Sequence, residues 1–479
     1  MDERDDWTAA RLLPTMGIRG QEEQEKRATS VLLAVMHAVP EFGHALLHEL
    51  GAPRSPRIDT YTEVRFKGAE KTSIPDGAIV CERGGKRWTC LVEVKTAGAS
   101  LRTEQVAGYL DAARERSYDG VLTISNDITD GCDHSPLAID GRKTRSAKLW
   151  HLSWWQIMTE AIVQHRHHGI ADPDQAWILG ELIAYLDSAA SGAGGFDDMG
   201  PNWVAVRTGA PDRTLRASDP AVRDVAARWD QLVQYLCLGL SQDLGERVVV
   251  HRPRKQDQNA RIDATSKRLA DEGVLQSAIR VPKAAGELAV TADLRARKLN
   301  VGVSLQAPTE GKPATRLAWL VRQLPDARGD ILISAQYANA RQPITATLEQ
   351  TRQERDALTY PADPKRPPRE FTVALLRPIG NKRGQGEGSF VSETRAQLLD
   401  FYRDVVQNIK PWQARAPRLP DVPESVPDEP SPEPPPFVAI QERDFGDAID
   451  PQDTVPIWQA TTTPSDGSDE ESEFADSDG

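Results

Sequence analysis

The chain has 479 residues, of which 39% are hydrophobic and 27% are charged, a composition typical of a globular protein with about two or three domains. The formal net charge is −13, but residues 414–479 alone carry 17 acidic and 3 basic side chains, so the preceding 413 residues carry a net charge of about +1. This distribution excludes a globally basic nucleic-acid-binding protein, because any nucleic-acid site would have to be a local basic patch.

The first elements follow an arm, residues 1–19, that has no clear pattern and is predicted to be flexible. A helical pattern of apolar residues starts at Gln21, is interrupted by Pro40 and resumes in a second helix that ends at Gly51. A strand is then predicted over residues 60–66. Because side chains alternate in a strand, Glu63 lies on one face of it.

A hairpin is predicted next, from Ile-Pro-Asp-Gly-Ala-Ile-Val at 74–80, the Gly84-Gly85 turn and Leu-Val-Glu-Val-Lys at 91–95. Glu93 and Lys95 share one face of the second strand, since side chains repeat every two residues. If the strands pair, Asp76 comes near Glu93 at one end of the sheet. Two carboxylates beside one lysine can hold a divalent metal ion and a hydrolytic water.

A helix over residues 101–116 follows, with Ser100 as its predicted N-cap. Gln105 and Tyr109 are four residues apart and therefore share one of its faces. Residues 119–125 form a further apolar strand. The predicted order is thus helix, three strands, helix and strand, an αβββαβ core.

These residues resemble a known signature. Pro75-Asp76 followed by Glu93-Val94-Lys95 is similar to the motif of the PD-(D/E)xK nucleases, and Gln105-x-x-x-Tyr109 is similar to the extra motif of their RecB-like branch. The resemblance covers residues 20–155. It implies a restriction-endonuclease-like fold, a further metal ligand in the Val94 carbonyl, and contact of Gln105 and Tyr109 with substrate or with Lys95.

The metal expected at Asp76 and Glu93 is Mg²⁺ or Mn²⁺, because hard oxygen ligands suit these ions better than Zn²⁺. Lys95 would orient or deprotonate the attacking water. The resemblance also implies an acidic residue upstream. Glu63 is our choice for it, because its strand should adjoin the one that bears Asp76, and Glu41 and Glu49 are helical alternatives.

The rest of the chain divides by composition. A nuclease-like domain with a helical extension is predicted over 20–192, closed by a Gly-rich boundary at 191–195, and an α+β domain of unknown role over 200–410. Strands are expected at 247–251, 288–294, 299–305, 330–335 and 371–376, and helices at 220–240, 316–324, 345–358 and 394–409. Residues 411–479 are rich in Pro, Glu, Asp and Ser and are predicted to be a disordered acidic tail.

The sequence therefore predicts an α/β, metal-dependent nuclease that acts on DNA, with RNA as the second substrate class. By fold-level analogy, the pathway would be bacterial defence or repair. The alternative is a non-catalytic nucleic-acid- or protein-binding scaffold on a degenerate nuclease fold. A protein partner would bind through the tail or the second domain.

A reduced, cytoplasmic location is expected from the N-terminus, the apolar runs and the cysteines of the chain. The N-terminus is acidic, unlike a signal peptide, and no apolar run approaches the ~18 residues of a membrane span. The four cysteines have neither zinc-site nor Cys-x-x-Cys spacing.

Overall fold

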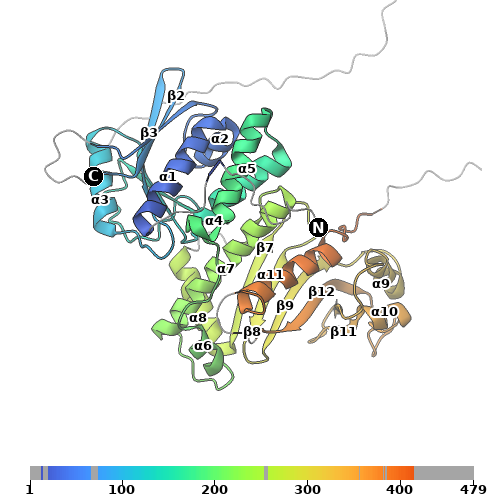
Figure 1. Cartoon of the computed structure of the whole chain (residues 1–479). Helices are drawn as coiled ribbons and strands as arrows, with labels where there is room; N and C mark the ends of the chain where they lie inside the picture. Colours follow the sequence, from blue (N-terminus) through green and yellow to red (C-terminus); the bar gives the residue numbers. More distant parts are fainter. Residues whose placement is uncertain are drawn as a thin grey trace, which may run out of the picture. The chain divides into compact units, whose positions relative to one another are not determined.

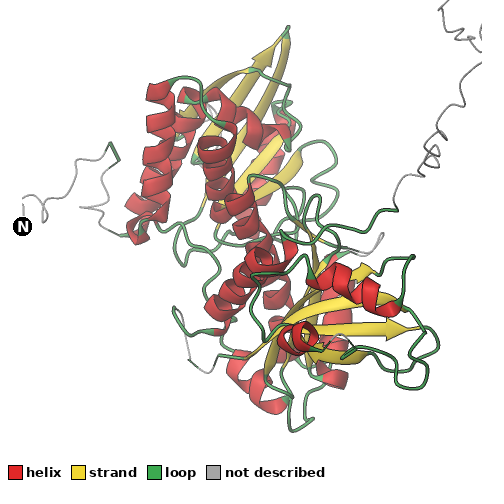
Figure 2. Ribbon diagram, turned by 90° about the vertical axis from the view of Figure 1, so that its right-hand side faces the viewer, coloured by secondary structure: helices red, strands yellow, loops and turns green. Residues whose placement is uncertain are grey.

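The structure is a computed structural model of the whole chain, and it describes residues 12–13, 20–65, 74–252, 257–354, 356–380, 382 and 386–414. The described residues, which end at 414, belong to one compact unit. The described part of the chain mixes helices with two β-sheets (Figures 1 and 2). Most of the predicted arm (1–19) and of the predicted tail (411–479) lies outside the described residues.

The first sheet has five strands in the order β1-β2-β3-β4-β5. The strands are β1 (Arg57–Thr62), β2 (Gly77–Arg83), β3 (Lys86–Val94), β4 (Gly120–Ser125) and β5 (Lys148–Ser153). The first three pair antiparallel and the last three pair parallel. Gly84 and Gly85 have φ values of 55° and 77°, as a tight turn between right-twisted strands requires. The predicted hairpin is therefore confirmed.

Helices cover both faces of this sheet. One face packs against α1 (Gln21–Ala38), α2 (Pro40–His48), α4 (Trp154–Val163) and α5 (Pro173–Asp187), and the other against α3 (Thr103–Glu115). Apolar side chains alternate between the two faces: Val92 faces the four helices and Leu91 faces α3. The expected order of elements is observed, with the first helix in two pieces.

Two predicted boundaries in this region are wrong. The first strand ends at Thr62, not at residue 66, because Glu63 adopts a left-handed conformation with φ of 49°. The helix predicted from residue 101 starts at Thr103, since Arg102 is extended and is the N-cap, and Leu101 is buried before it. Ser100 therefore does not cap it.

The second sheet has seven antiparallel strands in the order β11-β10-β12-β9-β8-β7-β6. They are β6 (Val249–Val250), β7 (Val274–Arg280), β8 (Leu288–Asp293), β9 (Lys298–Gln306), β10 (Leu332–Tyr337), β11 (Ile344–Thr347) and β12 (Pro368–Pro378). The accompanying helices are α6 (Trp203–Gly209), α7 (Pro220–Leu244), α8 (Gln258–Glu272), α9 (Pro313–Val321), α10 (Leu348–Gln353) and α11 (Phe390–Phe401). The buried side chains of α7 and α11 share one apolar core with the sheet. The mixture of helices and strands predicted for 200–410 is observed.

Contacts within the compact unit join the two sheets. Helix α4 packs against α7, and Gln242 Nε2 donates to Thr159 Oγ1 at 2.9 Å. Asp130, in the loop after β4, forms ion pairs with Arg252 and Arg261.

None of the described helices is by itself long and apolar enough to cross a membrane, although the bent pair α1 and α2 would be by length and composition.

Candidate functional site

The β2–β3 pairing brings Asp76 to the end of β3. Asp76 directly precedes β2, whose first residue, Gly77, pairs with Val92. The carboxylate Oδ2 of Asp76 accepts a hydrogen bond from the Val94 backbone N–H at 2.8 Å. Asp76 thus lies beside Glu93, the residue before Val94, as the sequence predicted.

Lys95 is the first residue after β3, and its backbone is held on both sides. Its N–H donates to the Ile124 carbonyl and its own carbonyl accepts from Trp154 Nε1, both at 2.8 Å. Its ammonium lies 2.8 Å from Glu93 Oε1 and 3.0 Å from the Val94 carbonyl oxygen. The carbonyl of the predicted metal ligand Val94 therefore lies beside the same ammonium group that contacts Glu93.

Glu25 on α1 is a member of this cluster that the sequence prediction missed. Its Oε2 lies 3.2 Å from the Lys95 ammonium, and its side chain is 15% exposed. A signal was present in the sequence. Glu25 precedes the buried residues Ala28 and Leu32 by three and seven positions, so it places a carboxylate on the buried stripe of the helix.

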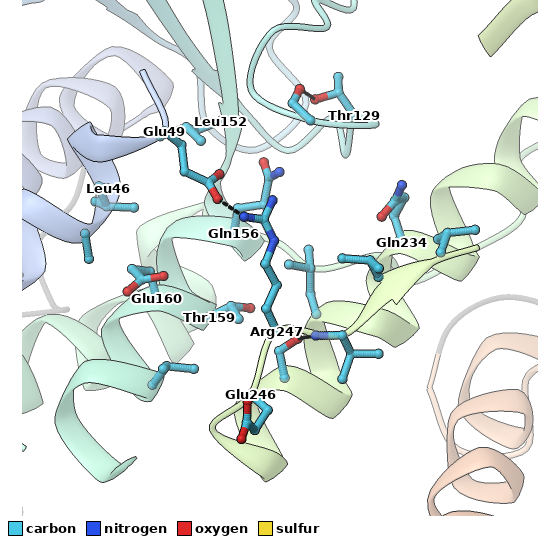
Figure 3. A pocket seen from close by; sticks show the side chains of 18 of the residues that line it. Leu46, Glu49, Thr129, Leu152, Gln156, Thr159, Glu160, Gln234, Glu246 and Arg247 are labelled. Atoms are coloured by element: carbon cyan, nitrogen blue, oxygen red, sulfur yellow. Dashed lines mark hydrogen bonds and ion pairs between the residues drawn. The ribbon is translucent and has the colours of Figure 1, made fainter. Parts of the chain in front are cut away.

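None of the three glutamates proposed for the upstream acid contacts Lys95, although Glu63 lines the same pocket as Asp76. The Glu63 N–H donates to the Asp76 carbonyl at 3.0 Å, so the two strands adjoin as expected, but its carboxylate faces Lys26 at 3.6 Å. Glu41 lies in the first turn of α2. Glu49 forms an ion pair with Arg247 in a different pocket, of about 400 Å³ (Figure 3). Lys95 is contacted by Glu25 and not by any of these three.

Gln105 and Tyr109 come together as predicted. Gln105 Nε2 donates to the Tyr109 hydroxyl at 2.9 Å, and this hydroxyl donates to the Ile74 carbonyl at 3.1 Å. Ile74 is two residues before Asp76, so the pair fixes the segment that carries the aspartate. Tyr109 is buried, whereas Gln105 is partly exposed. Of the two, Gln105 is the side chain that a bound molecule could reach.

The cluster is electrostatically strained. Glu93 is 1% exposed, and burial together with the neighbouring charge of Asp76 raises the pKa of Glu93 to about 7, although Lys95 opposes the rise. Burial also raises the pKa of Asp76, although the hydrogen bond from the Val94 N–H acts to lower it. For Lys95, burial lowers the pKa, but the carboxylates of Glu93, Asp76 and Glu25 outweigh it and the net shift is upward. Lys95 is therefore a cation at neutral pH.

A pocket opens beside Asp76. It has a volume of about 440 Å³, and its polar lining includes cations, hydroxyls and carboxylates: Lys26, Thr29, Ser30, Thr62, Glu63, Arg65 and Asp76. A molecule that entered here would meet Lys26 and Arg65 next to the acidic pair.

The donor set fits a hard divalent cation. The Lys95 ammonium lies 2.8 Å from Glu93 Oε1, and both Lys95 and Tyr109 act to lower the pKa of Glu93, which favours the carboxylate form that binds metal. Among the residues described, no three His, Cys, Asp or Glu side chains form a group that could hold a metal. Mg²⁺ binds through one or two carboxylates and keeps several waters, whereas structural Zn²⁺ needs four protein ligands. The residues therefore fit the former.

No model of a known protein family matches this chain, and no curated protein sequence matches it. The likeness to PD-(D/E)xK nucleases thus rests on the motif residues, on their spacing and on the order of the elements. The chemistry of the cluster is the basis for assigning a function.

Proposed function

We propose that Asp76, Glu93 and Lys95 form the catalytic centre of a metal-dependent nuclease that hydrolyses phosphodiester bonds in DNA. The observation that carries the proposal is the convergence of these three side chains. Asp76 accepts a hydrogen bond from the Val94 N–H and interacts with the carboxyl of Glu93, the Lys95 ammonium contacts Glu93, and Asp76 lines an open pocket. Buried ionisable groups with shifted pKa values beside a pocket are characteristic of active sites.

Asp76 and Glu93 would hold the metal, Mg²⁺ or Mn²⁺, with the Val94 carbonyl as a further oxygen. When bound, the ion would polarise a phosphoryl oxygen and lower the pKa of a bound water. The water oxygen would bond to phosphorus, the ester P–O bond would break, and the leaving oxygen would take up a proton.

Lys95 would act through its charge in this reaction. Because its pKa is raised, the ammonium cannot serve as a base at neutral pH without first losing its proton. It would instead stabilise the negative charge that develops on the phosphoryl oxygens, as fixed cations do in water-poor sites. Glu25 would hold this ammonium from the side of α1.

The pocket beside Asp76 would accept the substrate backbone. Lys26 and Arg65 supply positive charge there, and Ser30 supplies a hydroxyl donor; all three groups suit phosphate oxygens. In the structure Lys26 contacts Glu22 at 3.0 Å and Glu63 at 3.6 Å. A phosphate could replace these exposed partners at little cost, since exposed ion pairs contribute little stability.

A non-catalytic scaffold is the second candidate, and one observation favours it. Lys95 already contacts Glu93, Glu25 and the Val94 carbonyl, so the cluster can also serve as a structural ion pair. In that case the binding of nucleic acid or of a protein partner would be the same in Mg²⁺ and in EDTA.

Cleavage of linear, circular and single-stranded DNA in Mg²⁺ or Mn²⁺ tests the proposal. The wild type is compared with Lys95→Ala, and thermal unfolding shows whether the variant is folded. We expect metal-dependent cleavage that falls by roughly 10³-fold in the variant. The same cleavage by a folded Lys95→Ala variant would exclude this site, and no cleavage by the wild type would favour the scaffold.

A further inference from the structure

A second cationic pocket lies in the region of the second sheet. It is formed where the N-terminus of α9 meets the segment before β12, and α9 packs against α10 near the edge strand β11 (Figure 1). Its volume is about 1000 Å³, the largest of the pockets described here. Four prolines stiffen its wall, because each fixes its own φ angle: Pro313, Pro361, Pro364 and Pro367.

The charges that line this pocket are mostly positive. Three cationic side chains line it, those of Lys312, Arg316 and Lys365, and one carboxylate, that of Asp356. Both lysines are exposed, and no ion pair to either is found among the described residues. Two exposed ammonium groups without ion-pair partners among the described residues are available to an anion that enters this pocket.

Arg316 and the helix add to the positive field. The Arg316 guanidinium donates to the Gly311 carbonyl at 3.0 Å and to the Thr309 carbonyl at 2.6 Å, so its charge is fixed at the rim. Helix α9 has nine residues, and Lys312 is its N-cap. No side chain caps this end of the helix, so the positive end of the helix dipole lies at the pocket.

The aromatic side chain in the pocket is already occupied. The Arg366 guanidinium lies 4.5 Å from the centre of the Tyr360 ring, and the Tyr337 ring centre is 5.3 Å from that of Tyr360. A base therefore has no free aromatic face on which to stack. Stacking on aromatic side chains is how single strands are usually bound. The pocket offers charge without a base-reading surface.

We propose that this pocket binds the phosphate backbone of duplex DNA and anchors the substrate without reading its sequence. The identity of the occupant rests on the proposed nuclease function, and the positive lining supplies the charge complementarity. Phosphate contacts position a protein on DNA but carry no sequence information. The anchor would add affinity for long substrates to a catalytic cluster that contacts a single phosphodiester.

The test is a binding titration of the full-length chain in EDTA, with a fluorescent DNA duplex at several salt concentrations. The double variant Lys312→Glu/Lys365→Glu is compared with the control Lys267→Glu/Lys283→Glu, which reverses two exposed lysines outside the pocket. We expect the Kd of the first variant to rise by on the order of 10-fold and its salt slope to fall by about 1 to 2, because two phosphate contacts are lost. The control should stay within about twofold of the wild type.

Three results would overturn the proposal. One is equal affinity of the two double variants, and another is an effect that depends on the DNA sequence. The third is competition by poly-glutamate or by inorganic phosphate as effective as that by duplex DNA at equal charge, which would indicate an acidic protein partner or a small-anion pocket.

Hydrolysis of a small phosphodiester, bis(p-nitrophenyl) phosphate, separates this inference from the nuclease proposal. We expect the same rate for the wild type and Lys312→Glu/Lys365→Glu, because neither lysine belongs to the catalytic cluster. If no variant hydrolyses the diester while the loss of duplex affinity persists, the nuclease proposal fails and the anchor stands. If hydrolysis also falls in this variant, the lysines do not act as a separate anchor.

Discussion

The two sheets bury polar side chains in opposite ways. In the second sheet Gln397 of α11 is 1% exposed, and its Nε2 donates to the carbonyls of Leu299 and Leu375 at 3.0 and 2.6 Å. This neutral amide ties the helix to β9 and β12. In the first sheet Glu93 is equally buried, but it is an acid placed beside a second acid, Asp76, and its Oε1 lies 2.8 Å from the Lys95 ammonium.

This difference in buried polar groups indicates a packing role for Gln397 and a chemical role for Glu93. A buried amide whose Nε2 donates to two carbonyls stabilises a fold through those bonds, although the Oε1 of Gln397 has no hydrogen-bond partner among the described residues. A pair of carboxylates removed from water costs free energy, because both prefer to be charged in water. A sequence that keeps such a pair at the end of a strand gains something other than stability. Departures from local stability rules of this kind are expected at functional sites.

The largest expected effect is on the rate of DNA cleavage, and it should distinguish Glu25 from Glu63 at the site of the first sheet. Glu25→Gln removes one carboxylate from Lys95 and should lower the rate of DNA cleavage by about 10²-fold, as loss of a positioned charge does. Glu63→Gln alters an exposed pair with Lys26 and should change the rate by less than about threefold. Single-turnover rates in Mg²⁺ give both values. A larger loss in Glu63→Gln would restore Glu63 as the upstream acid.

The pH dependence of stability should differ between the regions. Because the pKa of Glu93 rises from 4.5 to about 7 on folding, the folded protein binds more protons than the unfolded chain between these values. The contribution of Glu93 to the free energy of unfolding is therefore largest below about pH 4.5. It falls by on the order of 2 kcal/mol as the pH rises toward 7. Urea unfolding without metal should show this fall in the wild type.

Glu93→Gln is the matched variant for that experiment, since its amide does not titrate. The difference in unfolding free energy between wild type and variant should grow in favour of the variant from pH 5 to pH 8. A difference that is independent of pH would mean that Glu93 is ionised in the folded protein at pH 5.

The smallest effect concerns the second sheet. Gln397→Met keeps most of the side-chain volume but removes the donor to two carbonyls, and should lower the free energy of unfolding by about 1–2 kcal/mol at every pH. Gln407→Met is the control, because the Gln407 amide makes an exposed bond to the Arg403 carbonyl and its loss should cost less than about 0.5 kcal/mol. Equal losses in the two variants would contradict the role assigned to Gln397.

Local patterns predicted the centre of the site. The Gly84-Gly85 turn sets the register of β2 and β3, and alternation along β3 puts Glu93 and Lys95 on one face. These signals lie within about 20 residues of one another. The position of Glu25 depends on how α1 docks across the end of β3, and a choice among several glutamates on one helix needs that long-range geometry.

Glu63 shows where a local rule was overridden. Strand adjacency was predicted correctly, but the positive φ of Glu63 ends the strand and directs its side chain to Lys26. In the second sheet most strands were located from their apolar runs. Their order was not predictable, because β12 inserts between β9 and β10, and more than sixty residues of sequence separate β9 from β12. One helix was predicted over 345–358, but residues 345–347 belong to β11 and the helix α10 covers only 348–353, since Thr347 caps a helix that starts at Leu348 and Glu354 is extended.

The most direct test of the account is a calorimetric titration of the wild type and Asp76→Asn with Mn²⁺. Asp76 and Glu93 are expected to hold one ion per chain, with tighter binding at pH 8 than at pH 6 because protons compete for Glu93. Asp76→Asn should lose this site while its thermal unfolding shows a folded protein. Equal Mn²⁺ binding by both proteins, or no binding by the wild type at pH 8, would contradict a metal centre at the end of β3.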